Sequence, residues 1–136
     1  MYEERLVKQV RNKMENTLKT KIKHQQKRKL RVRKALRGSA LKPRMCVVKT
    51  NKHIHIQLID DIDGLTLVSA STIEKSIRGT DQARKSKENA KTLGMNIAKQ
   101  AIEKKIEAAI FDRGKNKYHG ILAEVAEGAR EGGLKL

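Results

Sequence analysis

The spacing of apolar residues changes along this chain, from the helical period of three to four residues to the two-residue period of a strand. This change divides the chain into an N-terminal arm and a body. In the arm, residues 1–44, the apolar positions recur every three or four residues, as in an amphipathic helix: Leu6, Val7, Val10, Met14, Leu18 and Ile22. This stripe is only one apolar residue per turn wide, and Lys and Arg surround it. We therefore expect the arm to be disordered or partly helical when free.

The body, residues 45–136, begins with the two-residue period of β-strands. Three stretches predict strands: 45–50, 53–59 and 65–70. The second alternates cleanly, with Ile54, Ile56 and Leu58 on one face and polar residues on the other. A tight connection and an Asp-rich turn separate the three stretches, which favours an antiparallel meander with one face on the core.

The rest of the body returns mainly to the helical period. A helix is expected from about 87 to 105, a short apolar strand over 106–111 and a last helix from about 120 to 130. The predicted order is βββαβα. Because a helix connects the third and fourth strands, the sheet is expected to be mixed. The fold class is therefore α/β, a small mixed sheet packed by helices, with a basic N-terminal arm.

Charge is distributed unevenly between the two parts. Residues 1–44 hold 16 of the 32 Lys and Arg residues and three acids, whereas residues 45–136 hold 16 basic and 12 acidic residues. Most of the net charge of +17 thus lies in the arm, and an arm of this kind needs a polyanionic partner. From His24 onward the arm is almost continuously basic.

Composition excludes several classes of protein. The single cysteine, Cys46, rules out an internal disulfide and a cysteine metal cluster, and fits a reducing compartment. No apolar run is long enough to span a membrane, and the start lacks the apolar segment of a signal peptide. The three aromatic residues are too few to stack successive bases of a single strand. These facts favour contacts with the phosphates and the shape of a folded RNA.

Two places in the body offer candidate RNA contacts. On the polar face of the second strand, His53 and His55 could bind RNA together with Lys52 and Gln57. A half metal site there is the weaker alternative, because further ligands would have to come from Cys46 or His119.

The second place is the segment 111–120, in which Arg113, Lys115 and Lys117 lie just before the last helix. A helix N-terminus favours anions, so this loop could hold a phosphate. The alternative is a charged surface loop in which Tyr118 covers the core and Asp112 pairs with Arg113. Asp60, Asp61 and Asp63 are interpreted as a plain turn, and no catalytic or metal-binding set is predicted.

Four blocks of the sequence carry a resemblance: 44–59, 69–75, 111–113 with 118–120, and 128–134. Together they resemble the bacterial large-subunit ribosomal protein family numbered eighteen, in the family's order and spacing over residues 27–136. The resemblance implies a cytoplasmic, ribosomal protein without cofactor or catalysis that binds 5S rRNA. It also implies that the protein helps attach 5S rRNA to 23S rRNA in the central protuberance, as a monomer beside neighbouring ribosomal proteins. The implied fold has ribonuclease-H-like topology.

The resemblance also implies RNA-binding roles for particular residues. In the arm these are Arg28, Lys29, Arg31, Arg33, Lys34 and Arg37. In the body they are Arg44, Lys49, Lys52, His53, Gln57, Arg113, Tyr118 and His119. Two departures stand out: His55 occupies a position that is typically Tyr in the family, and the arm is longer than usual. Residues 1–13 are expected to be a lineage-specific extension or a result of start-site choice.

Two other functions compete with RNA binding. A nuclease on a ribonuclease-H-like sheet would need convergent carboxylates that bind Mg²⁺, and the body offers none outside the Asp60–Asp63 turn. A membrane-bound amphipathic arm would need a broad apolar face with aromatic anchors, and the arm has only Tyr2.

Overall fold

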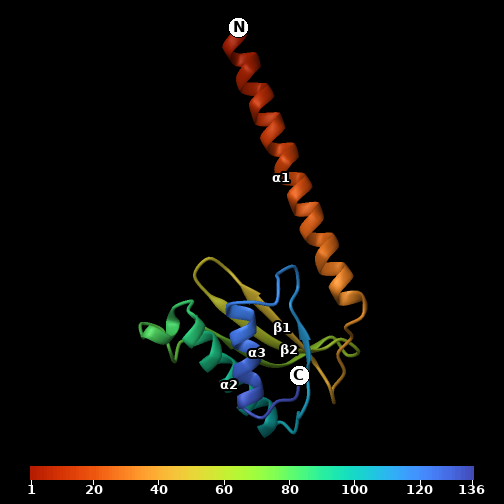
Figure 1. Cartoon of the computed structure of the whole chain (residues 1–136), viewed down its shortest axis with the longest axis vertical. Coiled ribbons are helices and arrows are strands. Elements are labelled where there is room, and N and C mark those ends of the chain that lie inside the picture. Colours follow the sequence, from red (N-terminus) through yellow and green to blue (C-terminus); the bar gives the residue numbers. More distant parts are fainter.

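The body is a four-stranded sheet with two helices on one face, and one long helix projects from it (Figure 1). The computed structural model describes all residues, 1–136. In chain order the elements are α1 (Tyr2–Lys34), β1 (Arg44–Lys49), β2 (Ile54–Asp60), β3 (Leu65–Ser71), a 3₁₀ turn (Asp81–Ala83), α2 (Lys87–Glu103), β4 (Ile110–Asp112) and α3 (Ile121–Glu131).

The sheet is mixed, as predicted. Its strand order is β3-β2-β1-β4, in which β1 pairs antiparallel with β2 and parallel with β4. The helix α2 supplies the crossover between β3 and β4. The α/β fold class is therefore confirmed, while the ribonuclease-H-like topology implied by the resemblance stays a prediction.

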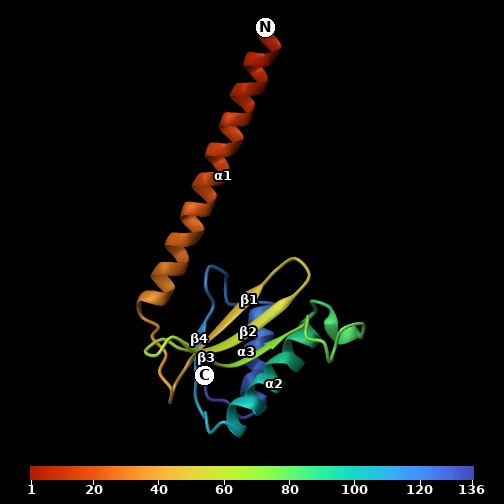
Figure 2. The ribbon, with the colours of Figure 1, turned by 180° about the vertical axis from the view of Figure 1, so that it is seen from behind.

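The alternating pattern of the strands directs apolar side chains to the face that α2 and α3 cover (Figure 2). Ile54, Ile56 and Leu58 of β2 are fully buried there. The two helices pack closely because glycines lie at their contact: a Cβ at Gly94 would overlap the Val125 carbonyl. The opposite face of the sheet is not covered by α2 or α3, and there the end of α1 contacts β1 and β4 through Arg33.

The fourth strand is shorter than the sequence predicts. The strand covers Ile110–Asp112, whereas Ile106 and Ala109 are buried outside it. The backbone N–H of Ala109 donates to the Lys135 carbonyl at 2.8 Å. Residues just before β4 thus form backbone hydrogen bonds with the C-terminal segment instead of with β1. Because they are buried in that position, residues 106–109 have the apolar pattern of a strand without belonging to one.

Helix α1 is continuous over 33 residues and none of them is buried. Glu3 and Glu4 lie in its first turn and basic residues in its last, which suits the helix dipole. In this structure residues 2–34 of the arm are helical and residues 35–44 are not, while the conformation of the free arm stays a prediction. Its apolar stripe is exposed, with Val10, Met14 and Leu18 each more than half accessible. None of the helices combines the length and apolar content needed to cross a membrane.

Candidate nucleic-acid interface

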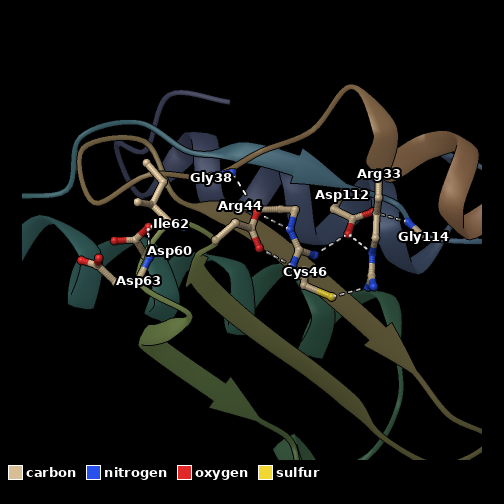
Figure 3. Close-up of polar contacts among 10 residues, drawn as sticks. Arg33, Gly38, Arg44, Cys46, Asp60, Ile62, Asp63, Asp112 and Gly114 are labelled. Atoms are coloured by element: carbon tan, nitrogen blue, oxygen red, sulfur yellow. Dashed lines mark hydrogen bonds and ion pairs between the residues drawn. The ribbon is translucent and has the colours of Figure 1, made fainter.

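A buried charge network fastens the end of α1 to the sheet (Figure 3). The Asp112 side chain on β4 is inaccessible, and its Oδ2 accepts hydrogen bonds from Arg33 Nε at 3.0 Å and Arg44 Nη1 at 2.7 Å. Its Oδ1 accepts from the Gly114 N–H at 2.8 Å. One carboxylate therefore joins the last turn of α1, strand β1 and the loop after β4.

Asp61 extends this network from the turn after β2. Its two oxygens accept from Nε and Nη2 of Arg44, both at 2.9 Å, in the bidentate geometry that favours arginine. The Gly38 N–H donates to Asp61 Oδ2 at 2.8 Å. The Arg44 guanidinium lowers the pKa of Asp61 from 3.8 to about 2, and its carboxylate partners raise the pKa of Arg44.

This low pKa predicts a pH dependence of stability. Because the folded-state pKa of Asp61 lies below its ordinary value, the ionised carboxylate stabilises the fold at neutral pH and down to about pH 4. The stabilisation is lost as the pH falls from about 4 through about 2. Unfolding titrations of the wild type and Asp61→Asn from pH 7 to pH 2 should show a stability difference that shrinks across that window. A difference that stays constant down to pH 2 would contradict the assignment.

The network shows what two of the candidate residues contact. Arg44 is only 8% exposed and holds two carboxylates, so its guanidinium is not available to a phosphate. Asp112 pairs with Arg33 and Arg44 rather than with Arg113, which is exposed. The Asp60–Asp63 segment is a turn, but it also carries a structural ion pair through Asp61. Since arginines neutralise Asp61 and Asp112, these two carboxylates do not form a metal-binding pair.

The predicted residues on the uncovered sheet face divide into hydrogen-bonded and exposed ones. His53 Nδ1 lies 3.1 Å from Thr72 Oγ1 and His55 Nδ1 lies 2.7 Å from Ser71 Oγ, and both rings are half-buried. Gln57 is exposed. Lys52 is exposed in the β1–β2 turn, and Lys49 is half-buried at the end of β1. No group of three metal-ligating side chains surrounds the two histidines.

The last loop presents its cations to solvent beside α1. Arg113, Lys115, Lys117 and His119 are exposed. Lys115 Nζ donates to Gln25 Oε1 of α1 at 3.2 Å, which joins the loop to the arm. The Tyr118 ring is 46% exposed and meets Phe111 edge to face. Part of the Tyr118 ring is thus accessible for stacking, and the ring contacts the core only through Phe111, which packs against it.

The structure brings some of the predicted residues together and keeps others apart. Lys29, Arg33, Lys49 and Lys115 line a groove of about 370 Å³ between α1 and β1. The remaining arm cations are exposed along α1 or just after it: Arg28, Arg31, Lys34 and Arg37. Gln25, Gln26 and Asn116 also line this groove, and the sequence analysis missed them because an isolated amide has no periodic or charge signal.

Comparison with known proteins gives one consistent result. Residues 19–136 match the model of a family described as ribosomal L18 of archaea, bacteria, mitochondria and chloroplasts. The large ribosomal subunit protein uL18 of Chlamydia caviae is 56% identical over 123 residues, which cover 90% of this chain and all of the relative. The corresponding proteins of Chlamydia abortus and Chlamydia muridarum are 55% and 52% identical over the same coverage.

The family match includes the whole body, with its charge network and the loop that carries the exposed cations. The end of α1, which the network fastens to the sheet, lies within the matched range as well. The resemblance noted in the sequence is thereby confirmed. The chain belongs to the ribosomal protein L18 family.

Proposed function

We propose that this protein is a structural, non-enzymatic constituent of the large ribosomal subunit that binds 5S rRNA. In this role it helps attach 5S rRNA to 23S rRNA in the central protuberance, as a single copy beside neighbouring ribosomal proteins. Family membership supports the ribosomal role and the location on ribosomes in the bacterial cytoplasm. The observation that supports RNA contact most strongly is the basic end of α1, held next to a second group of exposed cations in the last loop.

Three groups of residues have different roles in this proposal. The exposed arm cations Arg28, Lys29, Arg31, Lys34 and Arg37 bind phosphates. The loop cations Arg113, Lys115 and Lys117, with Tyr118 and His119, form a second contact, and Lys49, Lys52, His53, His55 and Gln57 form a third on the sheet. Arg44, and in part Arg33, act instead as the framework that fixes the arm.

A binding titration tests this function. The full chain should bind a 5S rRNA transcript more tightly than a generic RNA duplex of equal length. The logarithm of the affinity should fall steeply with the logarithm of salt concentration, with a slope near −0.9 for each phosphate neutralised on duplex. Filter binding at several salt concentrations measures both quantities. Equal affinity for the two RNAs would refute the proposal, even if the salt dependence were steep.

A further inference from the structure

The groove between α1 and β1 is lined by cationic, amide and apolar side chains together, a combination that the overall positive charge of the arm does not explain. Its walls come from α1, from β1 and from the loop after β4. Four cationic side chains line it and no carboxylate does. The contact between Lys115 and Gln25 bridges α1 and the loop at this groove, and the Arg33–Asp112 ion pair fixes the helix beside the sheet. The groove is therefore a built feature of the fold, suited to an anion.

Polar and apolar groups in the same groove narrow the kind of anion. Gln25, Gln26 and Asn116 place three side-chain amides in its lining, and an amide can both donate and accept hydrogen bonds. Ile22 and Val48 also line it and are 45% and 48% exposed, so aliphatic surface is available for a flat ring. A simple phosphate would use only the cations. A base joined to a phosphate would use all three kinds of group.

We propose that this groove receives one unpaired nucleotide of the bound RNA. The base packs on Ile22 and Val48, its polar edge meets the amides of Gln26 and Asn116, and the phosphate lies near Lys29 and Lys115. The volume of about 370 Å³ falls within the range of small-ligand sites and is too small for a duplex. Unpaired bases are also the usual targets of sequence-specific RNA recognition, because their edges are accessible. This inference rests on the proposed function and adds to it a contact that recognises a base.

The test combines two neutral substitutions with nucleotide-resolution chemical probing of 5S rRNA. Bound wild-type protein should protect at least one unpaired nucleotide, and Gln26→Ala or Asn116→Ala should remove that protection. Each variant should also bind 5S rRNA about 3- to 10-fold more weakly, the loss expected from a neutral hydrogen bond. Because neither substitution changes charge, the salt dependence should stay as in the wild type. Ala favours helix, so Gln26→Ala should leave α1 intact, as circular dichroism can verify.

Gln100→Ala provides the matched control, because Gln100 is an exposed amide on α2, on the opposite side of the sheet. It should change neither affinity nor protection. An abasic residue at the protected nucleotide supplies a second control. It should weaken binding of the wild type but cause little further loss in Gln26→Ala, since the two changes remove the same contact.

Two results would overturn the inference while leaving the proposed function in place. One is 5S rRNA binding in which the groove variants keep the wild-type protection pattern. The other is a polyglutamate peptide that occupies the groove of the RNA-bound protein while the nucleotide stays protected, which would assign the groove to an acidic protein segment. Failure of the wild type to prefer 5S rRNA at all would instead refute the proposed function.

Discussion

Deleting residues 1–32 is expected to lower the affinity for 5S rRNA about a thousandfold near physiological salt. The deletion removes eleven Lys and Arg residues, among them Arg28, Lys29 and Arg31. A slope near −0.9 corresponds to roughly a fivefold change in affinity for each phosphate contact at about 0.15 M salt, so the loss of about four contacts has this effect. The cut leaves Arg33, Gly38 and Arg44 in place, so the charge network and the body should stay folded. Filter binding over a salt series measures the loss, and the salt slope should become shallower in proportion to the contacts removed.

A charge-matched pair of variants separates specific contacts from general attraction. The first replaces Arg28, Lys29 and Arg31 of α1 by Gln. The second replaces Lys75, Lys87 and Lys99 by Gln, all of which are exposed and outside the arm. Both lose three positive charges. We expect the arm variant to lose much more affinity and to reduce the salt slope by about 3. Equal losses in the two variants would show that only net charge matters and would contradict the role given to the arm.

The regular elements of the body could be predicted because each depends on local patterns. Alternation in β2 indicated which residues face the core, and Ile54, Ile56 and Leu58 are all inaccessible. The helices α2 and α3 follow apolar periods within two residues of their observed bounds. The strand over 106–111 was predicted too long, because burial against the C-terminal segment gives the same apolar pattern as strand pairing.

The candidate site was only partly predictable, because its key contacts join residues far apart in sequence. Arg33 and Asp112 are 79 positions apart, and Arg44 and Asp112 are 68 apart. From the sequence, an Asp112–Arg113 pair was one of two alternatives for the last loop, and an RNA contact of Arg44 was implied only by the resemblance. The distribution of Lys and Arg along the sequence identifies the basic arm. It does not distinguish cations that form structural ion pairs, such as Arg33 and Arg44, from cations that are exposed to solvent.

Asp112 should accordingly be the polar residue on which the body depends most. Asp112→Ala is expected to lower the free energy of unfolding by about 3–5 kcal/mol, because it leaves Arg44 buried with one carboxylate fewer and Arg33 without its partner. This is a large part of the total stability of a small domain, about 5–15 kcal/mol. Chemical denaturation measures the loss. Hydrogen exchange should show faster opening of the last turn of α1, which Arg33 no longer fastens.

Two control variants should lose less stability than Asp112→Ala. Asp63→Ala removes an exposed carboxylate from a turn and should change stability by less than about 0.5 kcal/mol. Arg33→Ala should cost less than Asp112→Ala, because the Arg33 side chain is 32% exposed and Arg44 still compensates the buried carboxylate. If Asp112→Ala were as mild as Asp63→Ala, the network could not be what fixes the arm against the sheet. The groove between α1 and β1 would then lack its support, since the Lys115–Gln25 contact is exposed and too weak to hold a helix alone.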